Sequence, residues 1–160
     1  MKHILFYILC FFFCAASPAF AATSITIQET QSLTFPTIGL PSAGTTNLTI
    51  SPLNSSTSGT ATILSGTASR GTYTLTAKGK GGISISIDIT GITTGNAGLT
   101  LSAFRGFYRS QTISSFPSST LPLPAVSPGT PLYLGATVTA DSTVPAGSYT
   151  GSFDITVFVQ

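Results

Sequence analysis

The sequence predicts an all-β fold, an antiparallel sandwich of two sheets. Apolar and polar residues alternate with a period of two along most of the chain, which is typical of strands that bury one face. Turn-forming residues separate these runs, as in Pro41–Gly44 and Gly95–Gly98. Helical spacing of apolar residues is not sustained over three turns anywhere in the sequence. The three observations together favour strands throughout.

The first 21 residues predict a signal peptide. Lys2 and His3 precede an apolar run, Ile4–Cys14, and Ala19–Ala21 offers small residues at the two positions that a signal peptidase reads. An uncleaved membrane anchor is the alternative, but a run of this length rises only about 16 Å as a helix, against a hydrocarbon core of about 30 Å. We therefore expect a chain secreted through the general export pathway to the periplasm or the cell surface, without a transmembrane anchor. Its single domain is expected at residues 22–160.

The composition of that domain leaves few groups for catalysis. Both cysteines and the only histidine of the chain lie within residues 1–21, so the domain has no zinc ligands of the usual type and no histidine base for a nucleophile. A glycosidase pair could come from its four carboxylates, but each stands in a turn or a polar position of an alternating strand, where a solvated carboxylate is the default. We expect no enzyme, no metal and no cofactor. The four are Glu29, Asp88, Asp141 and Asp154.

Charge gives no indication of a polyanionic partner. Charged residues make up 6% of the sequence, and the formal net charge is +2. That balance is too weak to predict binding to nucleic acid or to an acidic membrane surface.

The expected strands are short alternating sets of apolar residues. A shift of one residue in the pairing of a strand would expose its apolar side chains to water, so the register of each strand is well specified. In chain order the sets are Ile25/Ile27, Leu33/Phe35, Leu48/Ile50, Ala61–Ile63, Tyr73/Leu75/Ala77, Ile83/Ile85/Ile87/Ile89, Leu99/Leu101/Ala103, Leu132/Leu134/Ala136/Val138 and Phe153/Ile155/Val157/Val159.

Half of the ten prolines fall between Pro117 and Pro131. Proline cannot donate to a strand ladder, so Ser114–Pro131 is predicted to be a long extended loop. Such a loop is either functional or a simple crossing from one sheet to the other.

Two arginines flank two aromatic residues in the stretch Arg105, Gly106, Phe107, Tyr108 and Arg109. This stretch could form a binding patch for a glycan, a peptide or a nucleic acid. The alternative, which we favour, is a strand end whose Phe107 points inward and is covered by the arginine stems.

The C-terminal segment carries the strongest signal. A turn, Val144–Gly147, leads into a strand with Phe153, Ile155, Val157 and Val159 on one face. A strand in this position either lies at the edge of a sheet or pairs with a strand supplied from elsewhere.

The pattern of this ending resembles that of spore-coat-protein-U-like domains and related secreted bacterial fimbrillin-like families. It reads Pro-Ala-Gly-x-Tyr-x-Gly followed by alternating apolar residues. Ser32–Ile38, Gly44–Ile50 and Pro131–Val138 are similar to segments of a related uncharacterised family. The resemblance implies an immunoglobulin-like β-sandwich on or outside the cell, distantly similar to the subunits of chaperone–usher pili.

Such pilus subunits lack one strand, and the N-terminal extension of a neighbour completes their sheet. In this chain, the resemblance implies that Gly147 and the final apolar set form the C-terminal edge strand used in assembly. It implies that Ala22–Gln31 is the donated segment, with Ile25 and Ile27 as its apolar side chains. The sequence departs from the pattern in its penultimate residue, Val159 instead of tyrosine, and in having no intradomain disulfide. Residues 24–29 could instead pair within their own sheet.

The leading functional hypothesis is a non-enzymatic structural subunit of a surface fibre, pilus or coat, assembled by β-strand pairing. Its partners would be copies of itself or related subunits, and a periplasmic chaperone. The alternative is a monomeric binding module for a glycan or peptide, which would use Arg105–Arg109 or the loop Ser114–Pro131.

Overall fold

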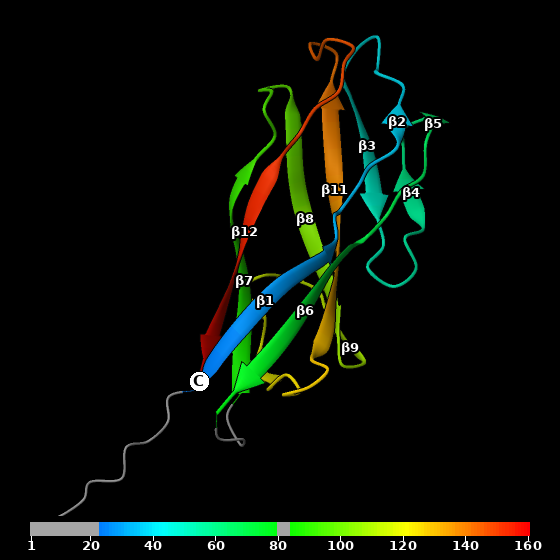
Figure 1. Ribbon diagram of the computed structural model, residues 1–160. Helices are drawn as coiled ribbons and strands as arrows, with labels where there is room; N and C mark the ends of the chain where they lie inside the picture. The colour runs from blue at the N-terminus through cyan, green and yellow to red at the C-terminus, as the bar shows by residue number, and fades with distance from the viewer. Residues whose placement is uncertain (1–22, 80–83) are drawn as a thin grey trace, which may run out of the picture.

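The computed structural model describes residues 23–79 and 84–160 (Figure 1). The predicted signal peptide and Ile83 lie outside the described residues. The described strands form an antiparallel β-sandwich, which confirms the predicted fold class. In chain order the strands are β1 (Ser24–Gln31), β2 (Thr37–Ile38), β3 (Thr45–Ile50), β4 (Thr57–Gly59), β5 (Ile63–Ser65), β6 (Gly71–Lys78), β7 (Ser84–Thr93), β8 (Leu99–Tyr108), β9 (Gln111–Ile113), β10 (Leu121–Pro122), β11 (Thr130–Asp141) and β12 (Ser152–Val159).

The larger, seven-stranded sheet is organised around β11. One edge of β11 pairs with β8 along most of its length. Its other edge pairs first with β6, at Thr130–Leu134, and then with β3, at Thr137–Asp141. Gly135 lies where the partner changes, and a Cβ at this position would collide with the carbonyl oxygen of Ile50. β1 extends the sheet beyond β6, β4 extends it beyond β3, and β9 extends it beyond β8.

The smaller sheet has the order β10-β7-β12. Together the two sheets match an immunoglobulin-like arrangement, in which one sheet carries strands A, B, E and D and the other carries C, F and G. β1, β6, β11 and β8 correspond to A, B, E and D, while β7 and β12 correspond to C and F. The described residues contain no strand in the position of G. Strands β2 to β5 are an excursion between the equivalents of A and B, in which β2 and β5 form a small sheet of their own.

The core lies between the inward apolar rows of the two sheets. The small sheet contributes alternate residues of β7, and the large sheet contributes alternate residues of β6, β8 and β11. The buried cluster consists of Tyr73, Leu75, Ile85, Ile87, Ile89, Phe104, Tyr108, Ile113, Leu121, Leu132, Leu134 and Ala136.

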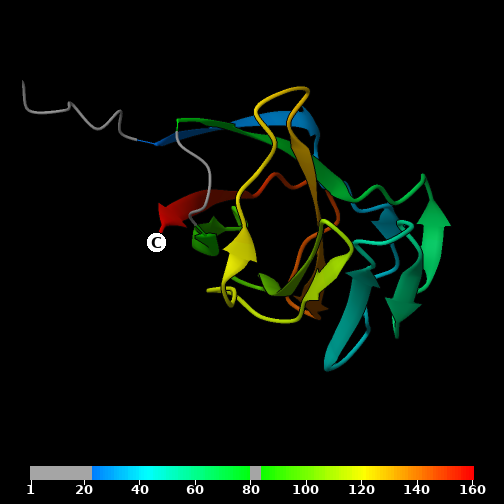
Figure 2. The ribbon, with the colours of Figure 1, turned by 90° about the horizontal axis from the view of Figure 1, so that it is seen from below.

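The proline-rich stretch Ser114–Pro131 crosses from one sheet to the other, which is one of the two alternatives predicted from the sequence (Figure 2). It leaves β9, follows the edge of β7, and returns to the large sheet at β11. Ser118 holds it to β7, because its N–H donates to the carbonyl oxygen of Ile87 at 2.7 Å and its Oγ accepts from the N–H of Ile87 at 2.9 Å. The hydroxyl of Tyr108 donates to the carbonyl oxygen of Pro122 at 2.9 Å. The crossing therefore ties β8 to the small sheet.

Three sequence-based expectations about strands were wrong. Of the expected set Ala61–Ile63, only Ile63 lies in a strand, β5, and its side chain is 43% exposed. Leu33 and Phe35 are not in a strand, since only an isolated bridge between Thr34 and Ser69 forms there. Ala103 does not join the inward row of β8, because it has a φ of 46° and is exposed. The pairing of β8 with β11 shifts register at this point, as in a β-bulge. The bulge reverses which face the following residues occupy.

The central strand of the small sheet offers a matched test of this core. Ile87 is 0% exposed and Ile92 is 42% exposed, although both belong to β7. We expect Ile87→Ala to lower the free energy of unfolding by about 2–5 kcal/mol, because it leaves a cavity between the sheets. Ile92→Ala should change it by less than about 0.5 kcal/mol. Urea denaturation of both variants checks the prediction, and equal losses would contradict the assigned core.

Candidate functional site

Two edge strands flank one side of the sandwich, and each has an edge that pairs with no strand of the described chain. β1 pairs with β6 in the large sheet, and β12 pairs with β7 in the small sheet. Figure 1 draws the start of β1 over the end of β12 and the two strands diverging upward, and Figure 2 shows that they lie apart, on the same side of the sandwich (Figures 1 and 2). We call this region, between β1 and β12, the seam. It is the position that strand G occupies in a complete immunoglobulin-like sandwich.

The inward side chains along the seam are only partly covered. Ile25 and Ile27 of β1 are half-buried and pack against the core cluster. Phe153, Ile155 and Val157 of β12 are half-buried in the same way. By contrast, the inward isoleucines of β7 and the inward leucines of β11 are buried. The loss of burial is therefore concentrated at the two strands that face the seam.

Phe153 fixes β12 against the opposite sheet. Its ring meets the ring of Phe104 edge-on, with centroids 5.0 Å apart, and that of Tyr73 at 6.3 Å. Such edge-to-face pairs contribute about 0.5–1.5 kcal/mol beyond their buried area. Because these contacts hold one end of β12, the strand remains in place although one of its edges is unpaired.

A groove of about 1180 Å³ opens along the seam, lined by residues of both sheets. Its floor includes Leu101 of β8 and Val138 of β11. The segment after β1 and the turn before β12 form its upper walls. Most of the lining is apolar or hydroxylated, so the groove suits an extended segment with apolar side chains better than a charged ligand.

Of the two carboxylates in the groove lining, Glu29 lies opposite Tyr73 in the β1–β6 register. Its Oε1 accepts a hydrogen bond from the hydroxyl of Ser32 at 2.5 Å. Burial, and next the negative charge of Glu29, raise the pKa of Tyr73 to about 12. Tyr73 is therefore neutral at physiological pH and supplies a phenol hydroxyl to the groove.

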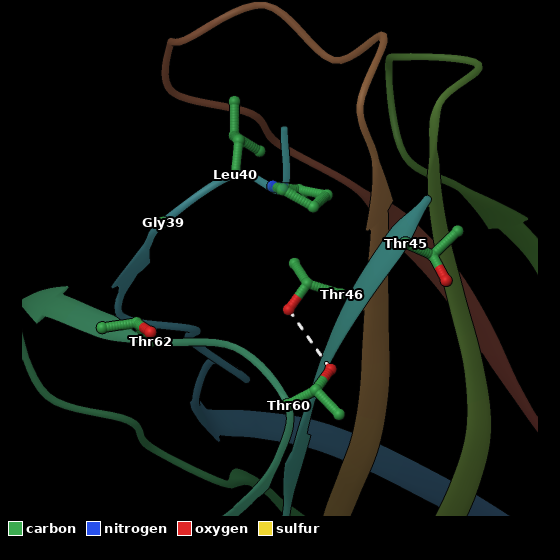
Figure 3. Close-up of a pocket in the computed structure, with 7 residues that line it drawn as sticks. Gly39, Leu40, Thr45, Thr46, Thr60 and Thr62 are labelled. Carbon is green, nitrogen blue, oxygen red and sulfur yellow. Dashed lines mark hydrogen bonds between the residues drawn. The ribbon is translucent and has the colours of Figure 1, made fainter. Parts of the chain in front are cut away.

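A second hollow, of about 310 Å³, lies between β3 and the segments on either side of the small β2–β5 sheet (Figure 3). Its walls carry threonine side chains, and the hydroxyls of Thr46 and Thr60 lie 3.3 Å apart within hydrogen-bonding distance. The lining contains no ionisable side chain, so it offers no acid, base or metal ligand. It is lined by Gly39, Leu40, Pro41, Thr45, Thr46, Thr60 and Thr62.

The structure places most of the predicted assembly residues at the seam. Gly147 lies in the exposed turn that lines the groove. Val159, at the end of β12, is 42% exposed. Ile25 and Ile27, predicted as a donated segment, belong to β1 and pair with β6 of their own chain.

The predicted patch Arg105–Arg109 is divided between two faces. Arg105 and Phe107 point outward from the large sheet, whereas Tyr108 points into the core and is 0% exposed. The favoured expectation of an inward Phe107 was therefore wrong, because the bulge at Ala103 shifts the alternation by one residue. Arg109 lies in the two-residue turn between β8 and β9, and its Nη1 donates to the carbonyl oxygen of Leu123 at 2.8 Å.

The outward face holds two residues that sequence reasoning did not single out. The ring of Tyr133 stacks with that of Phe107, with centroids 6.5 Å apart and planes at 23°. The guanidinium of Arg70 lies 3.7 Å from the centroid of the Tyr133 ring. Only the pairing of β8 with β11 brings Phe107 and Tyr133 together, so no local pattern could have indicated this cluster.

The groove residues are equally dispersed in the sequence. Glu29 stands in the polar half of a predicted strand, and its position opposite Tyr73 depends on a pairing between β1 and β6. Within the described residues, no group of three or more potential metal ligands is found. No described helix has the length and apolar character of a membrane span.

The raised pKa of Tyr73 predicts a loss of stability at alkaline pH. The unfolded chain releases this proton near the ordinary pKa of 10.0, while the folded domain keeps it until about 12. The free energy of unfolding should therefore fall as the pH rises from about 10 to about 12. Phenolate absorbance, compared between the wild type and Tyr73→Phe, measures the titration. Glu29→Gln should lower the pKa of Tyr73, and an unchanged titration in that variant would contradict the assigned contact.

Comparison with known proteins gives one match. Residues 25–158 match the model of a domain of unknown function, DUF4402, and this match spans every strand of both sheets except the outer residues of β1 and β12. No curated protein and no solved structure matches the chain. The seam and its groove thus lie within the matched region. The chain belongs to the DUF4402 family.

Proposed function

We propose that this protein is a non-enzymatic structural subunit of a surface fibre, pilus or coat, and that it assembles by β-strand addition at the seam. The observation that carries the proposal is the unpaired edge of β12 beside half-buried apolar residues of both sheets. Unpaired strand edges next to apolar surface are templates for another chain.

The backbone of β12 offers hydrogen-bonding groups to an added strand. The N–H of Gln160 donates to the carbonyl oxygen of Ser84 at 2.8 Å, so this residue points toward β7. The register between β12 and β7 is regular from Asp154 to Val159. Because peptide groups alternate in direction along a strand, the N–H and C=O groups of Ile155 and Val157 point toward the unpaired edge.

The side chains of the seam offer apolar surface in the same place. An added strand with alternating apolar residues would cover Phe153, Ile155 and Val157 on one side and Ile25 and Ile27 on the other. Full burial of one such side chain contributes about 1.5–3 kcal/mol. Two or three apolar residues of the incoming strand, with its backbone hydrogen bonds, would therefore give a stable contact.

The donated strand would come from another copy or from a related subunit. Within the segment suggested by resemblance, Ala22–Gln31, residues Ser24–Gln31 are engaged in this structure, since they form β1, which pairs with β6 of the same chain. A copy would have to release this pairing in order to donate the segment. The acceptor role thus has more direct support than the donor role.

The carboxylates in the groove lining support a contact role better than catalysis. Glu29 and Asp154 both contribute to the lining and are both exposed. Asp154 lies against Gly91, where a Cβ would collide with its carboxylate. These are the surroundings of solvated strand carboxylates, without the apolar burial that marks a general acid.

Substitution by proline tests strand addition directly. Val157→Pro removes one N–H from the unpaired edge and leaves the ladder to β7 intact. We expect residues 22–160 to form concentration-dependent oligomers in sedimentation velocity, and the Val157→Pro variant to be at least tenfold weaker in self-association. Val157→Ala, which shortens the side chain but keeps the N–H, should assemble more strongly than Val157→Pro.

Circular dichroism and thermal unfolding establish that both variants keep the fold. A wild-type domain that stays monomeric at all concentrations would overturn the proposal. So would a folded Val157→Pro variant that assembles as well as Val157→Ala.

A further inference from the structure

Charged residues of opposite sign lie on the two outer faces of the sandwich. On the large sheet, Arg105 alternates with the buried residues Phe104 and Gly106 and therefore points outward. On the small sheet, Asp88 lies between the buried Ile87 and Ile89 and also points outward. The outward faces of the two sheets are on opposite sides of the molecule, because their inward faces pack against each other.

The basic patch consists of Arg70, Arg105, Phe107 and Tyr133 on the large sheet. Arg70 covers one face of the Tyr133 ring, and Phe107 stacks with the same ring. Arg105 is exposed and pairs in register with Gly135, two residues from Tyr133. Such diagonal neighbours lie about 7–8 Å apart. The Nη1 of Arg70 donates to the carbonyl oxygens of Pro52 and Leu53, so this half-buried guanidinium is held in place over the ring. The patch therefore presents one exposed guanidinium, that of Arg105, and one fixed guanidinium, that of Arg70, around an aromatic pair.

The acidic patch consists of Asp88, Asp154, Thr156 and Phe158 on the small sheet. Asp88 pairs with Thr156, so Asp154 is its diagonal neighbour, again at about 7–8 Å. Phe158 is 52% exposed on the same face of β12. The acidic patch thus carries two carboxylates at a similar spacing, beside an exposed aromatic ring.

The other charged side chains of the described residues lie outside both patches. Lys78 is at the far end of β6, and Asp141 ends β11, where its Oδ1 accepts from the N–H of Thr143 at 2.8 Å. Glu29 lies in the groove, and Arg109 lies in the turn after β8.

We propose that the acidic patch of one copy docks on the basic patch of the next. The occupant is a second copy of this chain, because one molecule carries two outward faces of opposite charge, each with an exposed or half-buried aromatic group. Carboxylates meet guanidinium groups in this contact, and the ring of Phe158 covers the aromatic pair. The contact is lateral and leaves the unpaired edge of β12 free, although Asp154 also contributes to the lining of the groove.

The geometry of the two patches determines the form of the assembly. The contact is heterologous, since different surfaces of two identical chains meet. With the patches on opposite sides of the sandwich, repeating the contact builds an open row instead of a closed ring. Strand addition would extend a fibre through the seam, and patch docking would associate subunits side by side.

Sedimentation velocity of the Val157→Pro variant separates this contact from strand addition. At low salt, about 0.01–0.02 M, we expect this variant to form rows that dissociate near 0.5 M salt, where charges are screened within a few ångströms. When Arg105→Asp or Asp154→Arg is combined with Val157→Pro, self-association should weaken at least tenfold. Lys78→Asp makes the same charge change as Arg105→Asp at the far end of the face and should leave association unchanged.

Mixing the two charge reversals gives the sharpest result. Arg105→Asp keeps an intact acidic patch, and Asp154→Arg keeps an intact basic patch, so the two variants should associate with each other although each associates only weakly with itself. Failure of the mixture to associate would overturn the proposal. So would monomers at low salt, association insensitive to salt, or an equal loss in Lys78→Asp. A failure here would leave strand addition unaffected, because the Val157→Pro background excludes it from the readout.

Discussion

A strand in the interior of a sheet has a neighbour along each edge, and at the seam two strands that pack against the core each lack one of these neighbours. β11 has both, with β8 along one edge and β6 followed by β3 along the other. Its inward leucines are buried as a result. β1 and β12 each have a single partner among the described strands, and their inward residues are half-buried. The same packing rule that builds the core thus creates the surface proposed for assembly.

The fold holds the seam open without losing the sandwich. Phe153 packs edge-on against two rings of the large sheet, and the hydroxyl of Tyr108 donates a hydrogen bond to Pro122 in the crossing segment that follows β9. These contacts join the sheets at positions other than the seam. The excursion from β2 to β5 and the turn before β12 raise the walls of the groove. The domain can therefore keep a rigid core while one edge of each sheet remains available for contact.

The sequence predicted most strands because alternation is a local property. The inward rows of β6, β7 and β11 follow directly from residues such as Leu75, Ile87 and Leu134. The face of the sheet on which a side chain lies was predictable only as far as the alternation continued. The row Leu99, Leu101 and Ala103 implied an inward Phe107, but the bulge at Ala103 reversed the faces beyond it.

The local alternation of residues could not predict which distant strands pair with each other. The final apolar set indicated an edge strand, yet only the strand order shows that β1 lies across the seam from it. The cluster of Arg70, Phe107 and Tyr133 likewise depends on the pairing of β8 with β11. The separation of charge between faces is invisible in a sequence with a net charge of only +2.

Amide hydrogen exchange along β12 tests the unpaired edge most directly. In the dissociated subunit, the amides of Ile155 and Val157 should exchange rapidly, while those of Thr156 and Phe158, which point toward β7, should be protected. On assembly, the amides of Ile155 and Val157 should become protected as well. Equal protection of all four amides in the dissociated subunit would contradict the account, because the edge would then already be paired.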